Sequence, residues 1–463
     1  MADLRPLHNW TGPPAVLTLW APSASSLEHA RSATVSPVPP SYEQAQHLRS
    51  YLACEQRHEE MSRLLIFVWE ETGQCEPEVM SRVLTAHVRR HDTYHNRFEI
   101  QDDQIQRWTI AEPTHLTLQA TTIGQVSSED WQRHIANTPS PLNWDCFRFG
   151  ILQRSTGFTF FACIDHLHAD SSTITVLVTE IHAQYRALTR GENPPQLLPP
   201  YKYLDYCIRQ SQRTSEMKLS SPEVSEWVHF LHRNQGGMPS FALPLGISED
   251  RCPVEYTHLE VLDDASMNAF EAKCQSYGVR PIGGLLAAAA VAERELTASK
   301  RYRVVTPTST RQSPQEFLMS GWCMGLVPID FAVDDLSIKD LAVSAQQCFD
   351  NRRHLADVPI ERVLELAAEL PTIRPAASGG VMLSYMDMRR LRLNSTFASD
   401  WYEISGRVFI NRGMAAQVSL WLFRTKLGLS LTLAYPANQT ARDSINRYFE
   451  AFSSVCQQKF GSS

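Results

Sequence analysis

The stretch Ile164-Asp165-His166-Leu167-His168-Ala169-Asp170-Ser171 decides how this chain is interpreted, because it gathers imidazoles and carboxylates directly after an apolar run. The apolar run, residues 158–163, predicts a buried strand, and the branched apolar residues within 173–182 predict a helix after the stretch. A strand that ends in ionisable groups and turns into a helix places those groups at the rim of a core. Partial burial there can tune the pKa of a general base, so the stretch is the first candidate for catalysis.

Length and composition bound the class of protein. A chain of 463 residues exceeds one ordinary core, so two domains of about 200 residues each are expected. Hydrophobic residues make up 43% and charged residues 20% of the chain, as in ordinary globular proteins. The formal net charge of -7 and the lack of a basic run with interleaved aromatic residues argue against a nucleic-acid-binding surface.

The expected location is the cytoplasm. No apolar stretch approaches the roughly 20 residues that cross a bilayer, and the longest, 285–292, is rich in alanine and predicts a core helix. The N-terminus lacks the pattern of a secretory signal. The ten cysteines form no C-x-x-C pair, so neither a zinc ribbon nor a redox motif is indicated, and free thiols are expected. A peripheral contact with the inner face of the membrane stays open.

The order of predicted elements divides the chain into three parts. An N-terminal domain spans 1–190, a Pro-rich linker with a bridging helix spans 191–220, and a C-terminal domain spans 221–463. Each domain mixes helices with strands. Within the first domain the predicted elements are an extended lead-in over 1–40, a helix from Ser41, a strand at 61–70, a helix at 78–90 and a hairpin of 147–152 with 158–164.

The central stretch resembles the H-H-x-x-x-D-G signature of the condensation-domain superfamily, the two-domain acyltransferases related to chloramphenicol acetyltransferase. His166 falls on the second, catalytic histidine of that signature, and Asp170 falls on its aspartate. Further similarities run in the same order along nearly the whole chain, at residues 88–98, 141–145, 308–314 and 321–328. The resemblance implies an α/β (α+β) fold, with two chloramphenicol-acetyltransferase-like subdomains in a V-shaped pseudo-dimer with a central channel.

Within the superfamily the chain is most similar to the polyketide-associated (Pap-type) acyltransferases that esterify trehalose in cell-envelope lipids. Residues 38–49, 89–95, 321–329 and 383–387 carry that similarity. Two positions depart from the signature, since Asp165 replaces the first histidine and Ser171 replaces the final glycine. The turn at Ser171 therefore cannot need a backbone angle reserved for glycine. The D-F-G-W-G motif of peptide-condensing members is missing near residues 400–413, which argues against a peptide synthetase module.

The implied reaction is the transfer of an acyl group from a thioester to a hydroxyl, without a permanently bound cofactor. The resemblance implies an acyl-CoA donor or an acyl chain on the phosphopantetheine of a polyketide synthase carrier protein, and a trehalose or trehalose-based glycolipid acceptor. His166 is the expected general base, with one ring nitrogen toward the acceptor and the other held by a backbone carbonyl. In relatives the aspartate pairs with an arginine, so Asp170 and Arg311 are expected to form an ion pair that supports the His166 turn and joins the two halves.

Four further residues are candidate channel or oxyanion contacts, namely His168, Ser171, Trp322 and Met324. Either the hydroxyl of Ser171 or the backbone after Asp170 could donate a hydrogen bond to an oxyanion. His168 is interpreted as a tunnel-wall or packing residue, and Trp322 and Met324 as the lining of an acyl channel or as ordinary core. The central stretch lacks the ligand spacing typical of zinc sites, so no metal is expected.

Two rival functions stay open at the level of sequence. One is a stand-alone condensation enzyme that forms an amide, or an ester, on another acceptor. The other is a non-enzymatic docking protein that keeps the fold, although the intact His166, Asp170 and Arg311 argue against it.

Overall fold

The structure is a computed structural model, and it describes residues 4–102, 104–247, 251–334, 336–374, 379–390, 401 and 403–461. The chain separates into two compact units. Unit 1 comprises residues 1–215, 311–323 and 391–412, and unit 2 comprises residues 216–310, 324–390 and 413–463. Two segments from late in the sequence therefore belong to unit 1. Each unit combines helices with a large sheet, so the predicted mixed α/β class is confirmed.

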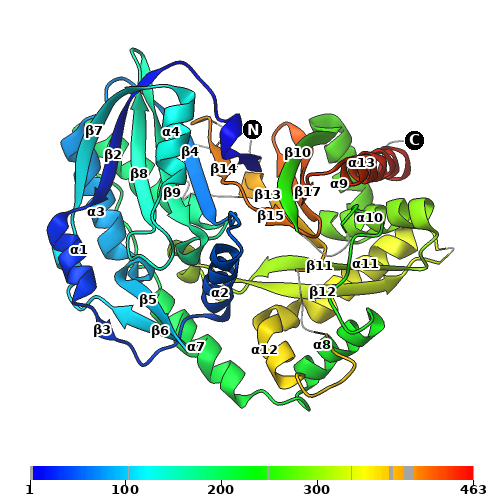
Figure 1. Cartoon of the computed structure of the whole chain (residues 1–463). Coiled ribbons are helices and arrows are strands. Elements are labelled where there is room, and N and C mark those ends of the chain that lie inside the picture. Colours follow the sequence, from blue (N-terminus) through cyan, green and yellow to red (C-terminus); the bar gives the residue numbers. More distant parts are fainter. Residues whose placement is uncertain are drawn as a thin grey trace. The chain divides into compact units, whose positions relative to one another are not determined.

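Unit 1 is built on a seven-stranded sheet whose strands are β1 (Leu4–Pro6), β2 (Ala15–Pro22), β4 (Leu64–Thr72), β7 (Leu118–Val126), β8 (Phe147–Gln153), β9 (Gly157–Asp165) and β14 (Arg407–Ile410). Their order across the sheet is β1-β14-β4-β9-β8-β2-β7 (Figure 1). Strand β1 runs parallel to β14, and every other neighbouring pair runs antiparallel. A strand from near the end of the chain thus lies between two strands from its beginning.

Strand β9 carries the candidate site to one end of this sheet. It pairs with β8 on one side and with β4 on the other, where Asp165 lies opposite Leu64. Residues 158–165 are all buried, as the apolar run predicted, because neighbouring strands flank β9 and side chains cover both of its faces. The predicted hairpin of β8 with β9 is confirmed. His166 is therefore the first residue after the end of the buried strand.

Helices cover both faces of the sheet. On one face, Trp131 of helix α4 (Ser128–Ala136) packs in a hydrophobic cluster with side chains of β2, β4 and β9, including Phe161. On the other face, the indole N–H of Trp20 in β2 donates a 2.8 Å hydrogen bond to Ser81 of helix α3 (Pro77–Arg90). Buried side chains on both sides leave β9 little freedom, which holds its carboxyl end in place.

The extended lead-in predicted for residues 1–40 is wrong. Ala15–Pro22 forms strand β2, which pairs with β7 and β8, and Ala24–Arg31 forms helix α1. The prolines of this region misled the prediction, because they flank the strand and leave its central hydrogen bonds intact. The run from Ala15 to Trp20 contains branched and aromatic residues that favour a pleated, buried strand.

The helix predicted after the central stretch is divided. It consists of α5 (Thr173–Leu177), the π-helical turn η5 (Val178–His182) and α6 (Ala183–Thr189). Such turns often occur at functional sites. The remaining regular elements of unit 1 are helices α2 (Tyr42–Gln56) and α7 (Tyr203–Glu216), whose last residue falls in unit 2, the short helical turns η1 (Leu7–Asn9), η2 (Asp92–His95), η3 (Pro113–His115), η4 (His166–His168) and η6 (Glu316–Leu318), and a small sheet of β3 (Thr34–Val35), β6 (Gln104–Thr109) and β5 (Asn96–Gln101).

Unit 2 is built on its own seven-stranded sheet in the order β12-β11-β13-β16-β17-β10-β15. The strands are β10 (Cys252–Asp263), β11 (Arg301–Ser309), β12 (Met324–Ala332), β13 (Met382–Asp387), β15 (Met414–Ala415), β16 (Ser419–Thr425) and β17 (Gly428–Pro436). Its helices are α8 (Pro222–Arg233), α9 (Asp264–Ser276), α10 (Pro281–Thr297), α11 (Ile338–Arg352), α12 (Ile360–Leu366) and α13 (Gln439–Phe460), with the short turns η7 (Arg353–Asp357) and η8 (Met388–Arg390). The predicted alanine-rich core helix is confirmed, since residues 285–292 of α10 are all buried.

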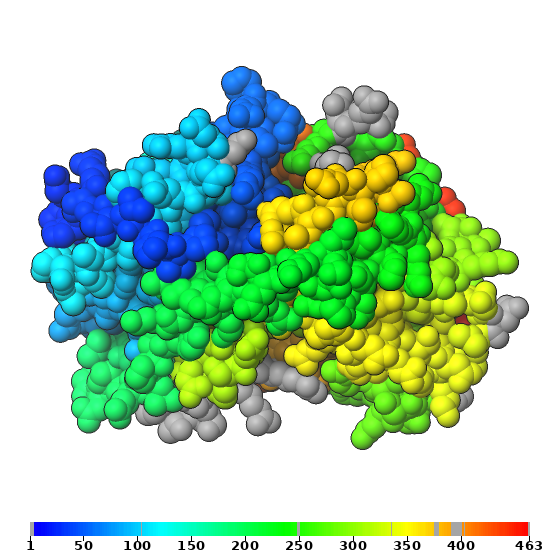
Figure 2. Space-filling model, turned by 90° about the horizontal axis from the view of Figure 1, so that it is seen from below, coloured from blue at the N-terminus to red at the C-terminus, as the bar shows by residue number. Residues whose placement is uncertain are grey.

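Two further observations concern the whole of the described chain. None of its helices combines the length and the apolar character that a membrane crossing requires. All ten cysteines are free. In the space-filling view of Figure 2, the N-terminal segments of unit 1, in blue and cyan, gather on one part of the surface.

Candidate active site

The imidazole of His166 sits on a short helical turn, η4, directly after β9. The backbone N–H of His166 donates a 2.7 Å hydrogen bond to the carbonyl of Arg63, which precedes β4. The carboxylate of Asp165 accepts a 3.0 Å hydrogen bond from the N–H of Leu167 and so caps the turn. One hydrogen bond therefore fixes the backbone of His166 to the residue before β4, and the other fixes the turn to the end of β9. The side chain of His166 itself is half-buried.

The ring of His166 packs on the indole of Trp322, with 3.7 Å between ring centroids and 36° between ring planes. Nδ1 is buried, and none of the described residues lies in hydrogen-bonding geometry with it. Aromatic packing against Trp322 therefore helps to orient this ring.

The environment of His166 favours its neutral form. Burial, and after it the nearby His47, lower the pKa of His166 to about 4. The backbone of His166 itself, and after it the carboxylates of Asp170 and Asp165, raise the pKa, but by less. An imidazole with this pKa is unprotonated at neutral pH and has a free lone pair, which is the form that a general base requires.

The structure brings Asp170 and Arg311 together within unit 1. Arg311 donates hydrogen bonds of 2.7 Å and 3.2 Å to the two carboxylate oxygens, and neither side chain is exposed. Asp170 also accepts hydrogen bonds from the backbone N–H groups of Ser172 and Cys323. Arg311 in turn donates to the carbonyls of Glu316 and Gly321. The pair thus connects the His166 turn to segment 311–323, which carries Trp322.

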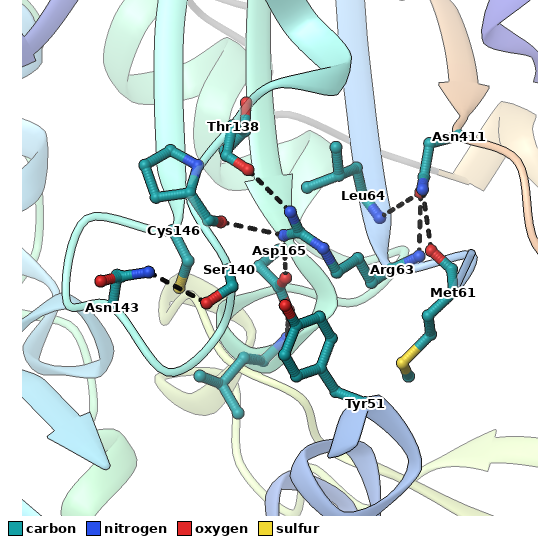
Figure 3. Close-up of polar contacts among 12 residues, drawn as sticks. Tyr51, Met61, Arg63, Leu64, Thr138, Ser140, Asn143, Cys146, Asp165 and Asn411 are labelled. Atoms are coloured by element: carbon teal, nitrogen blue, oxygen red, sulfur yellow. Dashed lines mark hydrogen bonds and ion pairs between the residues drawn. The ribbon is translucent and has the colours of Figure 1, made fainter. Parts of the chain in front are cut away.

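A second buried ion pair lies immediately before His166 (Figure 3). Arg63 donates a 2.6 Å hydrogen bond to Asp165, and its other donors reach the carbonyls of Thr138 and Pro139. On the opposite oxygen, Nε2 of His47 approaches Asp165 at 2.6 Å. Burial raises the pKa of Asp165, but the charges and hydrogen bonds of His47 and Arg63 outweigh burial and lower that pKa to about 2. Asp165 is therefore an ionised, fully partnered carboxylate.

Tyr203 fixes the backbone of Trp322 and of the residue before it. The hydroxyl of Tyr203, on α7, donates a 3.0 Å hydrogen bond to the carbonyl of Trp322 and lies 3.0 Å from the hydroxyl of Ser41, the N-cap of α2. Gly321 has φ of +152°, and a Cβ on it would lie 2.3 Å from the Tyr203 ring. Only glycine fits at this close approach, so Gly321 allows the backbone before Trp322 to pack against Tyr203.

The other predicted contacts fall in different places. His168 is buried, with Nδ1 3.1 Å from the hydroxyl of Thr93 and Nε2 3.3 Å from the sulfur of Cys146, as a packing residue would be. Ser171 is exposed and has no left-handed backbone angle, as its identity required. Met324 begins β12 and belongs to unit 2.

The described residues contain one group of side chains within metal-ligand range, His87, His91 and Glu180. Hydrogen bonds join the members of this group to one another. The N–H of Ser320 donates to Nδ1 of His91, so Nε2 of that ring carries the proton that Glu180 accepts at 2.8 Å. Arg90 and His87 also contact Glu180, at 2.7 Å and 2.9 Å. The group therefore joins α3, η5 and segment 311–323 as a hydrogen-bonded cluster.

Three residues of the site were not predicted as such from the sequence: His47, Arg63 and Tyr203. His47 belongs to the segment 38–49 that carried part of the family resemblance, so that segment offered a signal. Arg63 and Tyr203 offered none, because their partners are distant in sequence.

Comparison with known proteins identifies the family. The family described as Condensation domain matches residues 49–458. Trehalose-2-sulfate acyltransferase PapA2 of Mycobacterium tuberculosis is 39% identical over 456 residues, which cover 98% of this chain and 97% of that protein. The 2'-acyl-2-O-sulfo-trehalose (hydroxy)phthioceranyltransferase PapA1 of the same species is 37% identical over 457 residues, with 98% of this chain and 88% of that protein covered.

Solved structures agree with this assignment. A structure of PapA2 acyl transferase superposes with a TM-score of 0.95 at 38% identity, covering 99% of this chain and 100% of that chain. The condensation domain of the Monacolin K polyketide synthase MokA shares the fold, with a TM-score of 0.68 at 16% identity over 92% of this chain and 99% of that chain.

The chain belongs to the condensation-domain family. Its similarity to PapA2 and PapA1 extends over almost its entire length, and the protein is an acyltransferase. The predicted resemblance to the polyketide-associated branch of the family is confirmed.

Proposed function

We propose that this protein transfers an acyl group from a thioester, either acyl-CoA or an acyl chain on a carrier protein, to a hydroxyl of trehalose or a trehalose-based glycolipid. His166 is the general base. The main support is the half-buried, neutral imidazole that β9 presents at its end, in a chain that is 39% identical to a trehalose-2-sulfate acyltransferase. No permanently bound cofactor takes part in this proposal.

The chemistry needs one proton acceptor. A sugar hydroxyl is a weak nucleophile until its proton is removed, and the lone pair of a neutral imidazole can remove it. Because Nδ1 of His166 is buried, Nε2 is the nitrogen that faces the acceptor. The hydroxyl oxygen attacks the thioester carbon, and the carbon–sulfur bond then breaks. The proton taken by His166 passes to the leaving sulfur, which yields an ester and a free thiol.

The ion pair of Asp170 with Arg311 acts indirectly. Its members have no exposed surface, so neither contacts a substrate in this proposal. They hold the turn after His166 against segment 311–323, whose Trp322 orients the imidazole. Asp170 and Arg311 are therefore positioning residues for His166.

The test is direct measurement of product. The wild-type protein is supplied with a panel of acyl-CoA donors or with acyl chains on a carrier protein, and with trehalose, trehalose 2-sulfate or an amine as acceptor. Products are identified by mass spectrometry. The His166→Ala variant should lose about 10²–10⁴-fold in kcat while keeping the wild-type melting temperature. The exposed His229→Ala, on α8, serves as the control and should keep full activity.

Each outcome is informative. Acyl transfer by His166→Ala within a few fold of wild type would exclude the imidazole as the base. Amide formation with the amine but no ester with either sugar would replace the proposed acceptor by that of a condensation enzyme. Transfer only from carrier-bound acyl chains would assign the donor.

A further inference from the structure

A second imidazole lies beside His166. His47, on α2, has its ring centroid 6.3 Å from that of His166 and 5.5 Å from that of Trp322, whose plane it meets nearly edge-on at 78°. Its Nε2 bonds to Asp165, the residue directly before His166. His47 therefore contacts both the residue that precedes the base and the ring on which the base packs.

The hydrogen bond between His47 and Asp165 has a defined direction. Asp165 is ionised at neutral pH because its pKa is about 2, so the ring nitrogen of His47 donates to it. Arg63 balances the charge on the other oxygen at 2.6 Å. His47 and Arg63 thus hold one carboxylate oxygen each, and together they fix the orientation of Asp165.

Helix α2 makes a second bond to the same turn. Nε2 of Gln44 donates a 3.1 Å hydrogen bond to the carbonyl of Leu167, on the other side of His166 from Asp165. Gln44 is itself fixed by Ser41, whose hydroxyl accepts from the Gln44 N–H in the capping box of the helix. Gln44 and His47, one turn apart on α2, therefore hydrogen-bond to the two residues that flank His166.

We propose that His47 is a positioning residue of the reaction site, which holds Asp165 and the Trp322 ring so that the imidazole of His166 stays aligned with its substrates. This inference rests on the proposed role of His166. It assigns the work to the N–H of His47 and not to proton transfer by its ring, because His47 is almost fully buried and its donor already faces Asp165.

Two substitutions separate the donor from the ring. In His47→Gln the side-chain amide nitrogen can take the place of Nε2, so the bond to Asp165 is kept while the titratable ring is lost. In His47→Leu both are lost. The matched control is Gln46→Leu on the same helix, whose side chain is exposed.

We expect the substitutions to change kcat much more than KM. His47→Leu should lower kcat by about 10-fold to 100-fold and leave KM within about 3-fold, because a misplaced base slows the chemical step more than it weakens binding. His47→Gln should recover at least about a third of the wild-type kcat because it restores the donor. Equal losses in both variants would show that the ring itself is required, and wild-type kcat in both would show that His47 is dispensable. Either result overturns the proposal.

A second readout does not depend on the acceptor. Nitrogen NMR of the labelled histidine rings reports the environment of His166, which is assigned with His166→Ala. His47→Leu should shift the His166 signals, and His47→Gln should leave them close to wild type. If the wild type transfers no acyl group to trehalose or to trehalose 2-sulfate, the proposed function fails, whereas unshifted His166 signals in His47→Leu would refute the positioning role alone.

Discussion

Arg311 and Asp170 stand 141 positions apart in the sequence and bind each other through two hydrogen bonds, of 2.7 Å and 3.2 Å, with no exposed surface on either side chain. The contact joins the turn that carries His166 to the segment that carries Trp322. Since a buried charge without its partner is unfavourable, this pair should matter more for stability than any exposed ion pair of the protein.

Removing one partner tests that expectation. Asp170→Ala or Arg311→Ala should lower the free energy of unfolding by about 3–5 kcal/mol, because each leaves the other charge buried and unpaired. Denaturant unfolding followed by circular dichroism measures the change. The exposed pair of Asp130 with Arg133, 3.0 Å apart on α4, provides the control, and Arg133→Ala should unfold like the wild type. Wild-type stability of Asp170→Ala would refute the structural role of the pair.

The activity should resist acid more than an ordinary histidine would allow. The pKa of His166 is lowered to about 4, so the ring stays neutral well below its usual value of 6.5. On this basis kcat/KM should be nearly constant from pH 7 to pH 6 and fall with a midpoint near 4, as the base becomes protonated. Initial rates of thiol release across this range provide the measurement. A midpoint near 6.5 would contradict the lowered pKa of the His166 ring.

Stability should depend on the ionisation of Asp165. The folded-state pKa of Asp165 is lowered to about 2, against roughly 3.9 in an unfolded chain, so its contribution is present above about pH 4 and is lost as the pH falls through about 2. Asp165→Asn leaves Arg63 without its carboxylate and should lower the unfolding free energy at pH 7 by about 3–5 kcal/mol. Denaturant titrations at several pH values should show a constant gap between the two proteins from pH 7 to pH 5. A gap that closes within that interval would assign the effect to another group.

Gly321 offers a test of how Trp322 is placed. In Gly321→Ala the new Cβ would lie 2.3 Å from the ring of Tyr203, so we expect a loss of about 1–3 kcal/mol from overpacking and a lower kcat as the indole moves. Gly73→Ala is the matched control, because Gly73 also has a positive φ, +84°, but nothing lies within 4 Å of its added Cβ. Calorimetry and initial rates compare the two variants. Equal effects would mean that backbone strain, and not contact with Tyr203, explains the loss.

The local pattern of the chain predicted a substantial part of this site. The apolar run 158–163 followed by His166 predicted a buried strand that ends in a base, and β9 and η4 have that form. Ser41 with Gln44 predicted the start of α2. Backbone hydrogen bonding and side-chain period act over a few residues, so such elements can be derived from the sequence alone. The family resemblance added Arg311 as the partner of Asp170.

Packing decided the rest. The bond between His47 and Asp165 spans 118 positions, and the bond between Arg63 and Asp165 spans 102. Neither is encoded by a periodicity, because each arises only after α2 and β4 have packed against β9. The prolines of residues 1–40 likewise concealed β2, whose place between β7 and β8 depends on partners about a hundred or more positions away. Short-range preferences specify helices and strands, whereas the orientation of the His166 imidazole depends on which distant side chains the folded core brings beside it.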